Sequence, residues 1–172
     1  LKSKGPVLVY SNYVAMEGLQ IFKIYLNFFG FKKFDDDDRN NVKRNKPLDK
    51  NKNYLRFIEF HGGITKEDKD NDKSMFNNRQ NKDGNMIKII LISPAGTEGI
   101  NLLNTRQVHI MEPYWNEVRI EQVIGRGIRN CSHIGLERKK RNVTIYLLVS
   151  SLNNDPSKEN ETTDIEIYRK AE

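Results

Sequence analysis

The sequence contains a single cysteine, Cys131, among 172 residues. One thiol excludes an internal disulfide framework and any zinc site built from several cysteines, and it fits a reducing compartment. No apolar run approaches the roughly 18 residues that a membrane span needs, and no secretory signal opens the chain. We therefore expect an intracellular protein of about one domain, whose abrupt start indicates a piece of a longer polypeptide.

Acidic residues are in the minority. Lys and Arg number 29 against 23 Asp and Glu, which gives a formal net charge of +6. Much of the excess lies at 119–141, where seven basic residues stand against Glu121 and Glu137. This bias favours a polyanionic partner, either nucleotide phosphate or a nucleic-acid backbone. A solvated surface is the more common role of a run such as Lys139-Lys140-Arg141, and contact with nucleic acid or a neighbouring domain is the alternative.

Short apolar runs rich in β-branched residues alternate with segments of helical periodicity. Strands are expected at 7–11, 55–60, 88–93, 107–111 and 143–150, and helices at 19–29, 65–80 and 116–130. Thr65 and Asn116 are the expected N-caps of the last two helices. The alternation predicts an α/β domain with a mainly parallel sheet, in which binding loops follow the carboxyl ends of the strands.

The expected domain covers 1–152 and includes one segment of different character. Residues 35–53 open with four aspartates and continue mostly with Asn and Lys. They carry too little apolar surface to offset the entropy lost on ordering, so a polar surface insertion is expected. The last segment, 153–172, is a polar tail leading into a further helix that begins near Thr163.

The pattern Q-x-x-G-R-x-x-R is the centre of the functional prediction. In a helix, Gln122, Arg126 and Arg129 would fall on one face. Two neighbouring guanidiniums repel each other unless an anion lies between them, and the fork of an arginine suits a phosphate. Gly125 weakens a helix, so a close approach to its backbone is expected. The plain alternative is a surface helix with solvated arginines.

Four blocks in order resemble the second RecA-like lobe of superfamily 2 helicases and translocases. They are 7–11 (motif IV), His61-Gly62 (an H-G element), 93–102 (motif V, as S-x-x-G-x-x-G-I-N-L) and 122–129 (motif VI). The resemblance covers about residues 5–150 and implies a RecA-like three-layer sandwich. More narrowly, 110–116 followed by Cys131-Ser132-His133 is similar to helicase-like ATPases of nucleocytoplasmic large DNA viruses.

The resemblance implies a role for each matching residue. Arg126 and Arg129 would be catalytic arginine fingers, with Arg129 the finger proper. The ATP-binding residues would be Gln122, Gly99 and Asn101, the last standing where many relatives carry an Asp. The cofactor implied is ATP with Mg²⁺, held mainly by a first lobe that this sequence does not contain. The nucleic-acid-binding residues would be Ser11, His61, Gly62, Ser93 and Thr97.

Other aromatic and imidazole side chains are less specific. Tyr114 and Trp115 precede the motif VI helix, where packing beneath that helix is preferred to stacking on a base. His109 lies within a strand and is expected to be a core histidine, whereas the role of His133 is left undecided. No second metal ligand stands at the right spacing from His61, so no metal site is predicted.

Two absences limit the prediction. The chain has no G-x-x-x-x-G-K-[ST] phosphate loop and no D-E-x-[HD] run. We therefore expect that it does not hydrolyse ATP appreciably alone, and that its partners are DNA or RNA and the first RecA-like lobe of the same polypeptide, without a membrane. One rival is a non-catalytic helicase-like module binding nucleic acid or protein in a transcription complex. A free-standing α/β nucleotide-binding protein is the other.

Overall fold

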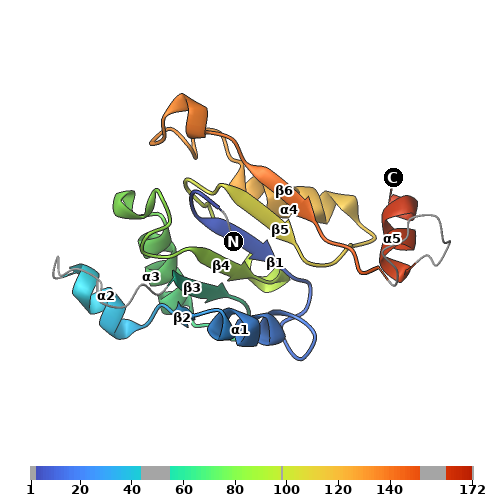
Figure 1. Ribbon diagram of the computed structural model, residues 1–172, viewed down its shortest axis with the longest axis horizontal. Helices are drawn as coiled ribbons and strands as arrows, with labels where there is room; N and C mark the ends of the chain where they lie inside the picture. The colour runs from blue at the N-terminus through green and yellow to red at the C-terminus, as the bar shows by residue number, and fades with distance from the viewer. Residues whose placement is uncertain (1–2, 44–54, 98, 152–161, 172) are drawn as a thin grey trace.

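The computed structural model describes residues 3–43, 55–97, 99–151 and 162–171. Six strands form one sheet in the order β2-β3-β4-β1-β5-β6, and every pairing is parallel (Figure 1). The strands are β1 Val7–Tyr10, β2 Phe31–Lys33, β3 Leu55–Phe60, β4 Ile89–Ile92, β5 Gln107–Ile110 and β6 Thr144–Leu147. The predicted α/β class with a mainly parallel sheet is confirmed.

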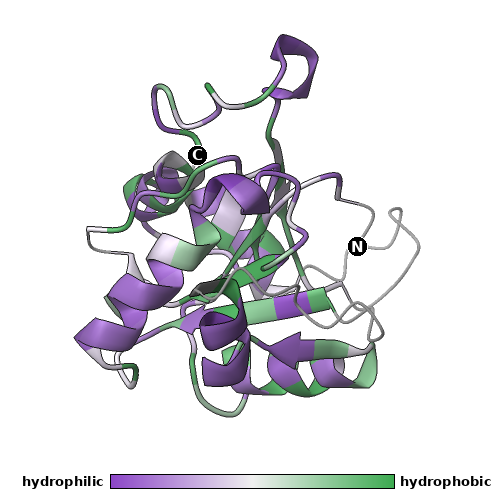
Figure 2. Ribbon diagram, turned by 90° about the vertical axis from the view of Figure 1, so that its left-hand side faces the viewer, coloured by the Kyte–Doolittle hydropathy of each residue, from purple (hydrophilic) through white to green (hydrophobic). Residues whose placement is uncertain are grey.

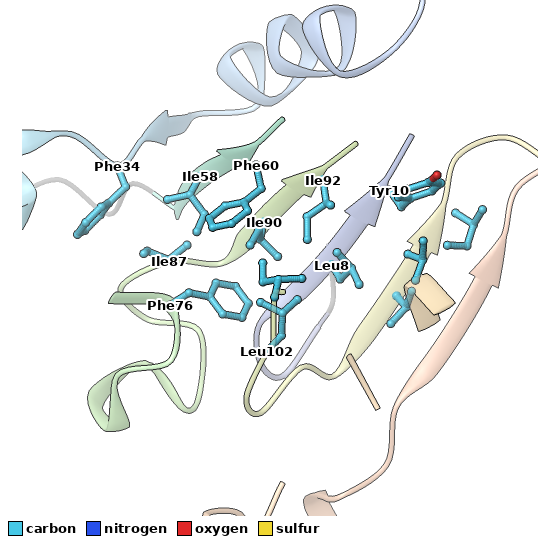
Figure 3. Close-up of a cluster of buried hydrophobic side chains, with 14 of the residues drawn as sticks. Leu8, Tyr10, Phe34, Ile58, Phe60, Phe76, Ile87, Ile90, Ile92 and Leu102 are labelled. Atoms are coloured by element: carbon cyan, nitrogen blue, oxygen red, sulfur yellow. The ribbon is translucent and has the colours of Figure 1, made fainter. Parts of the chain in front are cut away.

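Helices cover both faces of this sheet. They are α1 Leu19–Phe28, α2 Asp36–Lys43, α3 Lys66–Phe76, α4 Glu117–Gly127 and α5 Thr163–Ala171. Leu19 and Leu26 of α1 pack with one set of strand side chains. Phe76 of α3 and Val123 of α4 pack against the alternate strand residues, which point to the opposite face of the sheet. Figure 3 shows part of this second cluster. The arrangement is the expected three-layer sandwich.

The central strands are apolar along their whole length because both of their faces are covered. Each residue of β1 and β4 is at most 2% exposed. In Figure 2 hydrophobic residues gather on the central strands, while hydrophilic residues predominate in much of the surrounding helical ribbon. Burial on both faces explains why these strands are the clearest ones in the sequence, whereas edge strand β6 is exposed at all four positions.

The polar segment predicted as an insertion at 35–53 is helical in its described part. Helix α2 carries Asp36, Asp37 and Asp38 in its first turn, where negative charge is favourable. Asp38 is buried and accepts from Arg56 Nε on β3 at 3.0 Å, and Arg39 Nη2 lies 2.6 Å from Asp72 on α3. Ion pairs with buried partners therefore order this part without much apolar burial. Residues 44–53 lie outside the described residues.

The ends of α3 and α4 agree with the prediction only in part. Thr65 caps α3 as expected, since its Oγ1 accepts from Asp68 N at 3.2 Å. Asn116 occupies the N-cap position of α4, but its side chain makes no capping hydrogen bond. Helix α4 ends at Gly127 rather than near residue 130. Arg129 therefore lies beyond the helix, a correction that matters for the site.

Candidate functional site

The predicted nucleic-acid residues lie at the carboxyl ends of three neighbouring strands. Ser11 follows β1, and its N–H donates to Ile92 O of β4 at 3.1 Å. Ser93 follows β4, and its N–H donates to Phe60 O of β3 at 3.1 Å. Because β3, β4 and β1 are adjacent in the sheet, the structure brings the loops that follow them side by side.

Close packing joins the loops after β3 and β4. A Cβ added to Gly96 would lie 2.0 Å from Phe60 O, so only glycine fits there without a backbone shift. A Cβ on Gly62 would meet Ala95 Cβ at an ordinary contact distance of 3.7 Å. The H-G element and the motif V loop therefore form one continuous surface.

The hydroxyl groups of this surface are not equally accessible. Ser11 and Ser93 are at most 1% exposed, whereas Thr97 is half-buried. Ser11 Oγ lies 2.6 Å from Glu112 Oε1, and Asn12 N donates to Glu112 Oε2 at 3.0 Å. Burial raises the pKa of Glu112, although these hydrogen bonds act to lower it. The Ser11 hydroxyl thus joins two loops, and the accessible part of the predicted group is His61, Gly62 and Thr97.

His61 is fixed by its neighbours. Its Nδ1 accepts from Gly63 N at 3.1 Å, which leaves the ring proton on Nε2. Burial lowers the pKa of His61, and the nearby charge of Glu59 opposes that shift. A neutral imidazole with an Nε2–H donor is therefore the expected form at neutral pH.

The two predicted arginine fingers belong to a different part of the domain. Leu102 N of the motif V loop donates to Arg126 O at 3.2 Å, which places Asn101 close to the end of α4. A Cβ on Gly127 would lie 3.1 Å from Val108 Cγ2 and 3.4 Å from Thr105 Cγ2. The end of α4 therefore packs over the start of β5, on a face of the sheet rather than at its carboxyl edge.

Neither guanidinium has a carboxylate partner within the described ranges. Arg129 is exposed, and its side chain makes no hydrogen bond there. Arg126 is half-buried, and its Nε is buried without an acceptor. A buried donor left without an acceptor costs about 1–3 kcal/mol. The exposed guanidinium of Arg129 can meet a phosphate directly, whereas Arg126 Nε must become accessible before an anion can accept from it.

The remaining predicted ATP-binding residues are exposed. Gln122 lies one helical turn before Arg126, and Asn101 is exposed in the motif V loop. Gly99 has φ +68°, a left-handed conformation that favours glycine. Gln122 and Arg126 share the helix, but Arg129 follows its end, so the predicted single helical face of three residues is wrong.

Residues 1–131 match the family described as the helicase conserved C-terminal domain. The chain belongs to this family. It is 48% identical over 144 residues to a protein of Acanthamoeba polyphaga mimivirus that carries the name of an ATP-dependent RNA helicase, covering 84% of this chain and 16% of the relative. It is 33% identical over 165 residues to nucleoside triphosphatase I of Choristoneura fumiferana entomopoxvirus, covering 96% of this chain and 22% of the relative.

A solved structure agrees with the fold. The crystal structure of the C-terminal part of the Fun30 ATPase domain superposes with a TM-score of 0.64 at 18% identity, covering 97% of this chain and 39% of that one. The RecA-like assignment of this helicase C-terminal domain is confirmed. The chain spans less than a quarter of the length of the two viral relatives, at 16% and 22%.

The helicase C-terminal domain holds its motif V loop with a residue that the sequence did not single out. Asn77 caps the end of α3, and its Nδ2 donates to Asn101 O at 2.8 Å. Its Oδ1 accepts from Leu103 N at 2.8 Å. One amide therefore fixes the backbone on both sides of Leu102. A lone Asn at a helix end carries no sequence signal for this role.

Two predictions for side chains near this site need correction. Tyr114 is half-buried and its hydroxyl accepts from Arg119 Nη1 at 2.8 Å, but Trp115 is 71% exposed and does not pack beneath α4. His109 is half-buried rather than enclosed, and its ring stacks on Tyr146 of the exposed edge strand with 4.5 Å between the ring centroids. His133, left undecided by the sequence, is the more enclosed histidine, at 8% exposed.

Other site types find little support in the described residues. A cavity of about 920 Å³ lies at the opposite edge of the sheet, lined by residues that include Lys88, Arg106 and Asn142, and contains none of the predicted site residues. Among the residues that the structure describes, no group of His, Cys, Asp or Glu side chains is arranged to hold a metal ion. No helix in those ranges is long and apolar enough to cross a bilayer.

Proposed function

We propose that this domain is the second lobe of an ATP-dependent helicase or translocase and closes on a first lobe across bound ATP. The observation that carries the proposal is that the guanidiniums of Arg126, near the end of α4, and Arg129, two residues beyond it, have no carboxylate partner in the described chain. The backbone of Arg126 is hydrogen-bonded to the motif V loop. Arg126 would bind the γ-phosphate and Arg129 would neutralise charge that develops on it. Gln122, Gly99 and Asn101 would contribute polar contacts to the nucleotide.

Bound ATP with Mg²⁺ supplies the phosphoryl group that is transferred to water, and we assign the metal to the first lobe. Because this chain has no phosphate loop, its residues would supply only positive charge and orientation for the phosphate groups of ATP. We therefore propose that the 172-residue chain alone has no appreciable ATPase activity. Measurable turnover by the purified chain, lost in Arg129→Ala, would contradict this proposal.

The surface formed by the H-G element and the motif V loop, at the carboxyl ends of the strands, would hold the nucleic-acid backbone. His61, Gly62 and Thr97 lie at the accessible part of that surface, with Ser11 and Ser93 buried behind them. Contacts with sugar and phosphate position a protein on a strand without reading its sequence. Alternation between closed and open lobes would then move the protein along DNA or RNA. The name of the mimivirus relative favours RNA.

ATPase activity of the full-length protein, with and without single-stranded nucleic acid, tests the proposal. Arg129→Ala is expected to lower kcat by on the order of a thousandfold while ATP still binds. Arg138→Ala is the matched control, because Arg138 is an exposed arginine of the same basic segment outside motif VI, and its kcat should equal that of the wild type. Unchanged turnover in Arg129→Ala would favour the non-catalytic module instead.

A further inference from the structure

Arg129 lies two residues beyond the end of α4, and its side chain is exposed. The helix that would orient an arginine of motif VI stops at Gly127. An arginine finger must nevertheless be placed closely, since a misplacement of about 1 Å costs about a hundredfold in rate. Another part of the chain must therefore fix the backbone at residue 129.

Ser132 makes the first contact with that backbone. Arg129 O accepts from Ser132 N at 3.0 Å and from Ser132 Oγ at 2.7 Å. Cys131, between them, has φ +63°, a left-handed conformation that turns the chain back. Ser132 is only 3% exposed, and its own carbonyl accepts from Asn104 N at 3.0 Å. The turn is thus tied to the loop that leads into β5.

His133 continues the chain of contacts to the sheet. Its Nδ1 lies 2.8 Å from Ser132 Oγ, and its Nε2 lies 2.6 Å from Thr105 O. A carbonyl can only accept, so Nε2 carries a proton. In a neutral ring Nδ1 then has none, and the single Ser132 hydroxyl proton is shared between Arg129 O and Nδ1. Thr105 is fully buried just before β5. The backbone of Arg129 is therefore connected through Ser132 and His133 to a fully buried residue just before β5.

We propose that Ser132 and His133 are positioning residues for Arg129. Neither touches the nucleotide in this proposal, which rests on the proposed role of Arg129 as an arginine finger. They act through the Arg129 carbonyl, and their loss leaves the guanidinium present but misplaced. The only sign of this role in the sequence is the adjacent Ser-His pair, which begins three residues after the second arginine of motif VI.

Substitutions in the full-length protein separate the two hydrogen bonds. Ser132→Ala removes the hydroxyl but keeps the N–H that donates to Arg129 O. His133→Gln keeps an amide donor near Thr105 O and loses the contact with Ser132 Oγ, whereas His133→Asn does the reverse. We expect Ser132→Ala and both His133 variants to lower kcat by about tenfold to a hundredfold, with a smaller change in KM for ATP.

A double-mutant cycle distinguishes positioning from a general effect on folding. In an Arg129→Ala background, Ser132→Ala and His133→Gln should cause no further fall in kcat, because the finger that they place is already gone. His109→Gln is the matched control: it alters a half-buried histidine of β5 whose ring stacks on Tyr146 and contacts neither Ser132 nor Arg129, and any loss of stability should come without a change in kcat. Unfolding midpoints measured for all variants identify those that do not fold.

Each outcome decides a different question. An equal fall in kcat for Ser132→Ala in both backgrounds would overturn the positioning role, as would wild-type kcat in Ser132→Ala and in both folded His133 variants. If Arg129→Ala itself leaves kcat unchanged, the proposed function fails first. A fall in Arg129→Ala without any fall in the Ser132 and His133 variants refutes this inference alone.

Discussion

Two glycines near the end of α4 lead to opposite predictions. Gly125 and Gly127 are two residues apart in the same helix, yet a Cβ on Gly125 would meet no atom within 4 Å outside its chain neighbours and the backbone of its own helix, while a Cβ on Gly127 would lie 3.1 Å from Val108 Cγ2. The sequence predicted a close approach to the backbone at Gly125. Within the described chain the close approach is at Gly127, where α4 packs on β5.

The expected effects follow from helix propensity and from packing. Replacing a helical Gly by Ala gains about 0.5–1 kcal/mol, so Gly125→Ala should raise the unfolding free energy by that amount and Tm by about 1–4 °C. At Gly127 the same gain is opposed by overpacking against the fully buried Val108, which costs about 1–3 kcal/mol. Gly127→Ala should therefore be less stable than the wild type by about 1 kcal/mol.

Urea unfolding of the 172-residue chain measures both effects, and ATPase activity of the full-length protein adds a functional test. If ATP or the first lobe approaches the backbone beside Arg126, Gly125→Ala should be more stable and yet slower. A variant that is more stable and fully active would refute a close approach at Gly125. Destabilisation by Gly125→Ala would refute the open surroundings from which the stability gain is derived.

Two further predictions concern buried polar groups. Asn81→Ala should lower the unfolding free energy by about 3 kcal/mol, because it leaves Phe76 O, Met86 N and Ile87 N buried without their hydrogen-bond partner. Urea unfolding measures this loss, and a value below about 1 kcal/mol would contradict the prediction. Glu59→Gln should cost about 1–3 kcal/mol at pH 7. Burial alone would raise the pKa of Glu59, but hydrogen bonds from Lys23 and Lys33 outweigh it and hold that pKa below its usual value. The contribution is therefore present above the unfolded pKa of about 4.3 and is lost as pH falls below it, so a difference between the two proteins that stays constant down to pH 3 would refute the ion pairs.

Local sequence determined most of the elements of this domain. Strands β1 and β4 are continuous apolar runs because helices cover both of their faces, and such runs can be recognised without a structure. The Thr65 cap and the start of α5 near Thr163 also follow from neighbouring residues. The motif blocks marked the loops at the carboxyl edge and the two arginines, and comparison with relatives confirmed the family but left the role of each residue as a proposal.

Tertiary structure decided how these pieces are held. The sequence did not predict β2 or α2, because α2 is ordered by partners on β3 and α3, with Arg39 and Asp72 33 positions apart in the chain. Nor did it show that Ser11 and Ser93 are buried, or that His133 connects Arg129 to Thr105 28 positions before it. Periodicity and capping act over a few residues, whereas these contacts exist only after the parallel strands bring distant segments together. The sequence therefore identified the two arginines as candidates, and only the packed fold determined where their backbone lies.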